Sequence, residues 1–167
     1  VSVQTGSSHG GMPLPDGSIA SVKLNFDVLK NISRVARNKY HIGGAVQHGA
    51  STLPQDLFDR FPKANTLEIH LATGFQNIVY DSMPNSLRDE MYAWLKNDRK
   101  EEWEEGWTEK QFIYKTRKKA IGPFKEKLWK LSDREKQPIQ NSLEKQLSFL
   151  FEKLKVYNTR EIMRKYI

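Results

Sequence analysis

Short apolar runs alternate with amphipathic helical patterns over the first half of the chain. Apolar runs at 1–5, 42–47 and 66–71 predict three β-strands. Between the first two runs, apolar side chains recur every three or four residues and predict a helix over about 24–38. Strands separated by helices in this way indicate βαβ units and a parallel sheet, which is either doubly wound or part of a barrel.

The second half of the chain is expected to be helical throughout. Apolar positions recur at helical spacing between residues 85 and 154, and we expect glycines and prolines, Pro138 among them, to separate the helices. The sequence therefore predicts βα units over 1–84 and a helical extension over 85–167. We expect the extension to pack on the βα units or to form a contact between identical subunits, as in a homo-oligomer.

The composition narrows the classes of protein to consider. Of the 167 residues, 38% are hydrophobic, and no apolar run is long enough for a transmembrane helix. The first residues do not have the pattern of a secretory signal, and zero cysteines exclude disulfides and thiolate metal sites. We therefore expect a cytoplasmic protein with no membrane partner.

The net charge of +7 lies mostly in the second half of the chain. Residues 85–167 hold twenty basic and fourteen acidic side chains, against seven and six in residues 1–84. A nucleic-acid-binding patch is one interpretation, and a solvated helical surface that also attracts an anionic substrate is the other. Because basic residues alternate with Glu, as in Lys100-Glu101-Glu102, we favour the solvated surface and expect no nucleic-acid partner.

Two strand ends carry the same His-Gly pattern. His9 and Gly10 follow the first predicted strand, and His48 and Gly49 follow the second, with Ser51 shortly after. Neutral imidazole is a common Zn²⁺ ligand, and two imidazoles on neighbouring parallel strands can converge on one ion. A pair of structural hydrogen-bonding histidines is the alternative, but the repeated pattern favours a ligand site.

Three polar motifs occur in a fixed order over residues 1–84: Ser8-His9-Gly10-Gly11, Val46-Gln47-His48-Gly49-Ala50-Ser51 and Glu68-Ile69-His70-Leu71-Ala72-Thr73. With the helix beginning near Leu24 between the first two, they resemble the C-terminal portion of the class II (zinc-dependent) fructose-bisphosphate aldolase family. The resemblance implies an α/β fold in which these residues form about strands 6–8 of a TIM (β/α)8 barrel, with a helical C-terminal extension.

The resemblance also assigns ligands to the two His-Gly strand ends. It implies that His9 and His48 are two of three ligands of Zn²⁺ or of another divalent metal ion. Gly10, Gly49 and Ser51 would then bind a substrate phosphate, together with a monovalent cation.

The third strand end departs from the family pattern. The family has a substrate-contacting Asn there, followed by an acidic residue and a Thr near phosphate, whereas this chain has His70, Ala72 and Thr73. The resemblance implies a catalytic position for His70 and a phosphate-binding hydroxyl for Thr73. Because an imidazole replaces Asn and Ala72 replaces a carboxylate, the substrate need not be fructose 1,6-bisphosphate.

Two predicted helix starts indicate an anion site beside these residues. Residues 49–51 lead into a helix expected at Pro54, and residues 72–74 lead into one expected near Phe75. Each helix start offers unpaired N–H groups and the positive end of its dipole, both of which favour an anion. We therefore expect a phosphate between the two segments.

The function that the resemblance implies is a lyase of carbohydrate metabolism, such as glycolysis. A metal-dependent aldolase of this kind cleaves or forms a C–C bond in a ketose (bis)phosphate through a zinc-stabilised enediolate. The family's catalytic Asp and third zinc His lie on earlier strands, and Val1 begins a strand without a start methionine. We therefore expect the N-terminal half of the barrel to come from the same polypeptide or from a second chain. The alternative is a non-catalytic homologue that binds a phosphosugar or acts as an assembly subunit.

Overall fold

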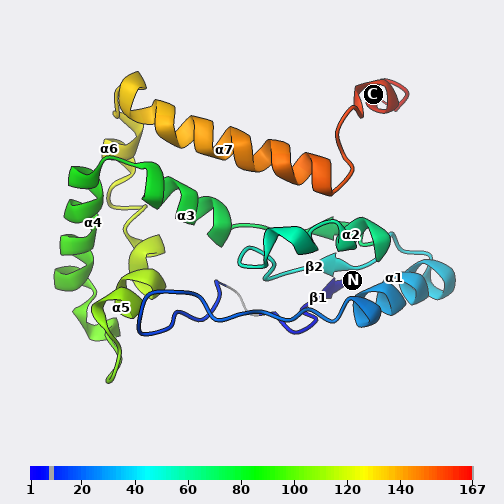
Figure 1. Ribbon diagram of the computed structural model, residues 1–167, viewed down its shortest axis with the longest axis horizontal. Helices are drawn as coiled ribbons and strands as arrows, with labels where there is room; N and C mark the ends of the chain where they lie inside the picture. The colour runs from blue at the N-terminus through cyan, green and yellow to red at the C-terminus, as the bar shows by residue number, and fades with distance from the viewer. Residues whose placement is uncertain (8–9, 167) are drawn as a thin grey trace.

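A computed structural model of the chain describes residues 1–7 and 10–166 (Figure 1). The elements of the first half are β1 (Ser2–Val3), α1 (Phe26–Tyr40), β2 (Val46–Gln47), the 3₁₀-helix η1 (Gln55–Leu57), α2 (Arg60–Lys63), β3 (Glu68–Ile69) and α3 (Thr73–Ser82). Those of the second half are α4 (Asn85–Asp98), η2 (Lys100–Glu102), α5 (Glu109–Thr116), η3 (Arg117–Lys119), α6 (Lys125–Trp129), α7 (Asp133–Lys153) and α8 (Arg160–Met163).

The three strands form one small parallel sheet in the order β1-β2-β3. Val46 in the central strand pairs with Ser2 on one side and with Glu68 on the other. The prediction of three adjacent parallel strands is therefore confirmed, although each strand is shorter than its apolar run. Because parallel strands in register end at the same edge, the segments that follow the three strands begin at one end of the sheet. The chain is thus a mixed α/β protein with a small parallel sheet.

The helix α1 forms where the apolar spacing predicts it, shifted by two residues. The Asn25 side chain caps its start by accepting a hydrogen bond from the Val28 N–H at 3.0 Å. Leu29, Ser33 and Ala36 are buried on one face of the helix. The Ser33 hydroxyl accepts a hydrogen bond at 3.2 Å from the N–H of Ala45, just before β2, so that a polar contact as well as apolar packing fixes the helix against the sheet.

The segment after β2 differs from the predicted helix at Pro54. It folds into η1 and then the four-residue α2, both too short to carry the dipole of a regular helix. Phe58 and Phe61 are buried here and pack edge to face, with ring centroids 5.7 Å apart. Burial of the two rings therefore determines the path of this segment more than helix periodicity does.

The described residues form two hydrophobic cores. The sheet core is formed by Leu29, Ala45, Ala50, Leu53, Phe58, Phe61, Ala64 and Leu150. The helical core is formed by Tyr80, Met83, Leu87, Met91, Leu95, Phe112, Ile113, Ala120 and Phe124. Tyr80 belongs to α3 and Leu150 to α7, and these two helices pack side by side (Figure 1). Each core therefore contains a residue from the other half of the chain, and the helical extension packs on the βα units.

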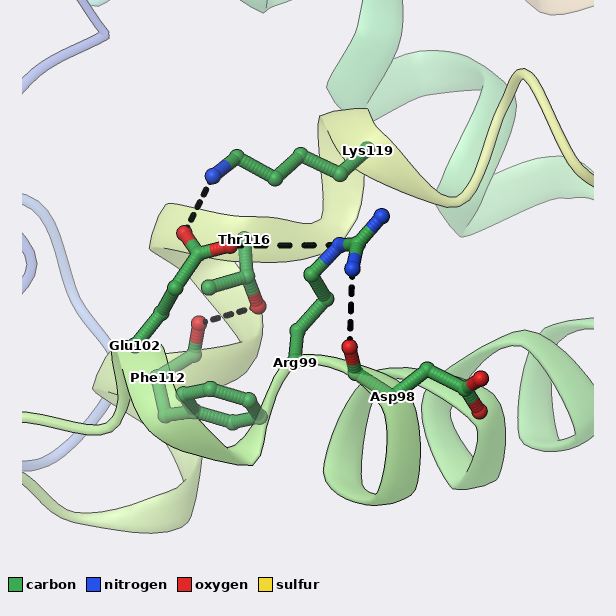
Figure 2. Close-up of polar contacts among 6 residues, drawn as sticks. All are labelled: Asp98, Arg99, Glu102, Phe112, Thr116 and Lys119. Carbon is green, nitrogen blue, oxygen red and sulfur yellow. Dashed lines mark hydrogen bonds and ion pairs between the residues drawn. The ribbon is translucent and has the colours of Figure 1, made fainter.

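The position of α5 in the helical core is fixed by stacking and by ion pairs. The rings of Trp103 and Phe112 are stacked, with centroids 4.5 Å apart and planes at 7°. Figure 2 shows Glu102 on η2 bonded to Lys119 on η3, with Arg99 on its other side. The two ends of the α5 segment are thus tied to the end of α4.

The helix α7 continues through Pro138, so the expected interruption is wrong. Pro138 removes one backbone hydrogen bond, a cost of about 3 kcal/mol in a helix interior. The helix starts at a capping box in which Ser132 and Glu135 bond each other's backbone N–H groups, and its later turns pack on α3. The cap and this packing offset the missing bond.

Within residues 1–7 and 10–166, no helix combines the length and the apolar character needed to cross a membrane.

Candidate functional site

A cavity of about 530 Å³ lies at the carboxyl edge of the sheet. Its lining residues are Gly10, His48, Gly49, Ser51, Ile69, His70, Leu71, Ala72 and Thr73. Every candidate residue of the sequence analysis that the structure describes is on that lining, because all of them follow parallel strands. His9, the remaining predicted metal ligand, lies outside the described residues.

The two His-Gly strand ends share a backbone feature. Gly10 has φ +80° and Gly49 has φ +71°, in the left-handed region that side chains with a Cβ rarely adopt. Glycine is therefore required at both positions by the turn that follows each strand. The same turns bring the backbone of both residues to the wall of the cavity.

Two imidazoles lie next to each other inside the cavity. The rings of His48 and His70 have centroids 4.3 Å apart and planes tilted by 52°. His70 Nε2 lies 2.5 Å from Glu68 Oε1, and the two side chains are both about half exposed. If Nε2 carries the proton that this contact uses, His70 Nδ1 is the nitrogen left to accept one.

Ser51 and the start of α3 also line the cavity. The Ser51 Oγ accepts a hydrogen bond from the Ala72 N–H at 2.9 Å, which leaves the Ser51 O–H as a donor. Thr73 is the first residue of α3, and a Cβ placed on Gly10 would lie 3.8 Å from its Oγ1. The N-cap residue of α3 is Ala72, whose side chain cannot accept a hydrogen bond from the first turn of the helix.

Because η1 and α2 are so short, only one of the two predicted helix starts is present at the cavity. The helix expected at Pro54 does not supply one, and α3 begins at Thr73 rather than at Phe75. Among the described residues, the groups here that could favour an anion are the start of α3 and the hydroxyls of Ser51 and Thr73.

A buried glutamine forms hydrogen bonds behind the cavity-lining residue His48. Gln47 is fully buried, accepts a hydrogen bond from Thr5 Oγ1 at 2.9 Å and donates to the His48 carbonyl at 2.6 Å. Ser7 Oγ donates to the same carbonyl at 2.7 Å. These bonds join the ends of β1 and β2 and fix the backbone of His48. The sequence analysis missed Gln47, for which the available signal was an amide in a strand otherwise apolar.

Tyr114 on α5 is a second residue that was not among the candidates from the sequence. The Tyr114 hydroxyl donates a hydrogen bond at 2.7 Å to the carbonyl of Gly10. The two residues are separated by 104 positions, so no local pattern indicates that they meet.

The described residues fit part of a metal site. His48 and His70 supply two imidazoles, the nitrogen ligands that Zn²⁺ accepts, within one cavity. No group of three or more His, Asp or Glu side chains able to hold a metal ion is found among residues 1–7 and 10–166. Two imidazoles are therefore compatible with a Zn²⁺ ion, and a complete ligand set would require residues beyond those described.

The cavity lining is polar but carries no carboxylate, lysine or arginine among the residues described there. Its recognition groups are imidazoles, hydroxyls and backbone N–H groups. This set suits an oxyanion that is bound mainly through hydrogen bonds.

Comparisons of the chain with models of protein families, with curated proteins and with solved structures found no match.

Proposed function

We propose that this chain forms the metal- and phosphate-binding part of an aldolase-like lyase that acts on a ketose phosphate. The observation that carries the proposal is the cavity itself, which is lined by the six described residues selected from the sequence: Gly10, His48, Gly49, Ser51, His70 and Thr73. The TIM-barrel relationship, the catalytic role of His70 and the aldolase reaction are parts of this proposal.

The phosphate of the substrate would be bound by one side of the cavity. The Ser51 and Thr73 hydroxyls can each donate a hydrogen bond, and the first turn of α3, whose N-cap residue Ala72 supplies no side-chain acceptor, adds N–H donors and a favourable dipole. Anchoring the phosphate there would orient the reacting carbons beside the histidines. This would lower the entropic part of the activation free energy of the reaction.

The histidine side of the cavity would hold the reacting end of the substrate. His48, with His9 as the second expected ligand, would bind a divalent ion, which supplies Lewis-acid polarisation of a carbonyl when bound. His70 lies against the His48 ring, where it can orient the substrate or hold a proton at Nδ1. The remaining ligand and the proton-transferring carboxylate would come from the N-terminal half of the barrel.

A second candidate function is supported by the absence of a carboxylate from the described cavity lining. A protein with this lining would bind a phosphosugar, or assemble with other subunits, without cleaving a bond. Retro-aldol activity of the complete protein separates the two candidates, since only the first predicts release of a triose phosphate.

Phosphate binding is tested by introducing a negative charge at Ser51. Ser51→Asp places a carboxylate against the anion, and like charges about 4 Å apart cost about 4 kcal/mol at an effective dielectric constant near 20. We expect the dissociation constant for inorganic phosphate, measured by calorimetry, to rise at least about tenfold. Ser86→Asp, on an exposed position in the first turn of α4, adds the same charge away from the cavity and is expected to leave phosphate binding unchanged.

Zinc content is measured for these two variants and for a third, His48→Ala. We expect Ser51→Asp to retain bound Zn²⁺ and His48→Ala to lose it, because the two residues lie on opposite sides of Gly49. Equal phosphate affinity in the Ser51 and Ser86 variants would show that the anion site is elsewhere. Unchanged zinc content in His48→Ala would remove His48 from the ligand set.

A further inference from the structure

The helix α5 donates a row of hydrogen bonds to the loop that follows β1. The Tyr114 hydroxyl bonds the carbonyl of Gly10 at 2.7 Å, and Gln111 Nε2 bonds that of Pro13 at 3.1 Å. Closer to the start of the helix, Thr108 Oγ1 bonds the Pro15 carbonyl at 3.2 Å and Lys110 Nζ bonds the Asp16 carbonyl at 3.1 Å. Every acceptor is a main-chain carbonyl, so these four bonds depend on the backbone path of loop 10–18.

The loop approaches α5 closely along this row. A Cβ on Gly17 would lie 2.9 Å from the Lys110 side chain, and Gly17 has φ +89°, so glycine is needed there for both reasons. In Figure 1 the blue segment after β1 runs away from the sheet to α5 before it returns to α1. An excursion of this kind exposes backbone carbonyls, and the α5 side chains satisfy them.

The same segment of chain also contacts α3, the helix whose first residue, Thr73, lines the cavity. The Arg117 guanidinium lies over the ring of Tyr114, 4.5 Å from its centroid, and over that of Tyr80 on α3 at 5.2 Å. It also donates to the Asn77 side chain on α3. Arg117 is 8% exposed, so these contacts are desolvated and geometrically restrictive.

Residues 108–117 therefore contact two segments that contribute to the cavity lining. Tyr114 bonds Gly10, and Arg117 bonds Asn77 on α3, the helix that begins at Thr73. Ring stacking of Phe112 on Trp103 and the ion pair of Glu102 with Lys119 hold the α5 segment in the helical core (Figure 2).

We propose that α5 is a positioning element for the anion site, in which Tyr114 sets the place of the Gly10 backbone relative to Thr73. The inference rests on the proposed phosphate-binding function of the cavity. Tyr114 contacts no ligand itself and acts through the carbonyl of Gly10. The helical extension thereby becomes part of the binding site, although its side chains do not line the cavity.

The test compares Tyr114→Phe with Tyr40→Phe in the full 167-residue chain. The first variant removes the hydroxyl that bonds Gly10 and keeps the ring beneath Arg117. The second removes a hydroxyl from a side chain that is 60% exposed at the end of α1. Hydrogen exchange of the loop 10–18 amides, the dissociation constant for inorganic phosphate and the Tm are measured for both.

In Tyr114→Phe we expect exchange at the loop amides to quicken about fivefold and the phosphate dissociation constant to rise about three- to tenfold, because one net hydrogen bond is lost. Saturating phosphate should slow loop exchange in the unchanged protein, since a ligand that selects the ordered loop stabilises it. Tyr40→Phe should match the unchanged protein in both measurements. If the bond had only a structural role, its loss would lower the Tm and leave the dissociation constant of the folded protein for phosphate unchanged.

Three results would overturn the inference, and they are distinguishable from one another. Unchanged loop exchange in Tyr114→Phe would show that α5 does not hold the loop, whatever the cavity binds. Faster exchange with unchanged phosphate affinity would show that the loop's position does not matter for the anion. If the unchanged protein binds no phosphate, the proposed function fails, and the positioning role fails with it.

Discussion

The Tyr80 hydroxyl donates a hydrogen bond at 2.6 Å to the main-chain carbonyl of Arg117, and its ring is fully buried in the helical core. Burial raises the pKa of Tyr80 well above its usual value near 10, because the phenolate would lose its hydration. The nearby Tyr92 raises the pKa further, and the Arg117 cation opposes both effects. Tyr80, together with Asn77, therefore connects α3 to Arg117 in the segment that positions the candidate site.

The raised pKa predicts a loss of stability at alkaline pH. Below pH 10 Tyr80 is protonated in both the folded and the unfolded chain, so its ionisation does not change the free energy of unfolding. Above pH 10 the unfolded chain releases the proton and the folded chain keeps it, so the free energy of unfolding falls by about 1.4 kcal/mol per pH unit.

Urea unfolding of the unchanged protein and of Tyr80→Phe, measured at several pH values from about 8 to 11, gives this loss. At pH 8 the variant should be less stable by about 1–3 kcal/mol, because the Arg117 carbonyl loses its partner. Between pH 10 and 11 its stability should fall less than that of the unchanged protein. Tyr157→Phe, at a side chain that is 56% exposed, should keep the steep dependence. Parallel curves for all three proteins would contradict the assignment to Tyr80.

At the scale of elements, α7 is the helix that joins the two halves of the chain. It packs along α3, and its Leu150 side chain completes the sheet core while Ile139, earlier in the helix, packs against the helical core. Leu150 is 3% exposed, whereas Leu147, one turn earlier, is 40% exposed. Alanine variants at these two positions therefore measure how much the buried face of α7 contributes to the free energy of unfolding.

We expect Leu150→Ala to lower the free energy of unfolding by about 2–5 kcal/mol through lost apolar burial and the cavity left behind. Leu147→Ala changes the same atoms at a solvent-exposed position and should lower it by no more than about 0.5 kcal/mol. Chemical unfolding followed by circular dichroism gives both values. Equal losses in the two variants would mean that α7 does not dock on the sheet core through Leu150.

At the scale of the whole molecule, the two cores share α3 and α7 and should unfold as one unit. The four histidines all lie in residues 1–84, and the four tryptophans all lie in residues 85–167. Each half of the chain therefore contains its own spectroscopic probe. Joint unfolding requires both probes to report the same event.

We expect the urea midpoint from tryptophan fluorescence to coincide with the midpoint from the histidine ring proton signals. Leu150→Ala should move both midpoints together, because Leu150 belongs to a helix that touches both cores. Separate midpoints, or a shift of the histidine signals alone, would show instead that residues 1–84 and 85–167 are independent folding units.

The amino-acid sequence determined the local part of this structure. The spacing of apolar residues predicted α1 within two residues, because a 3.6-residue period requires only neighbours along the chain. Strands separated by helical segments predicted a parallel sheet, and the parallel order placed His48, Ser51, His70 and Thr73 at one edge. The repeated His-Gly pair also marked two turns that require positive φ. The chemical roles of those residues stay predictions.

Tertiary structure decided which distant surfaces meet. Pro138 inside α7 and the short η1 depart from local expectation because packing of α7 on α3 and burial of Phe58 and Phe61 outweigh helix propensity. The bond from Tyr114 to Gly10 spans 104 positions and joins a helix side chain to a main-chain carbonyl, which carries no side-chain signature in the sequence. Periodicity specifies the face that an element buries, but the partner of that face is selected by the packing of the complete chain.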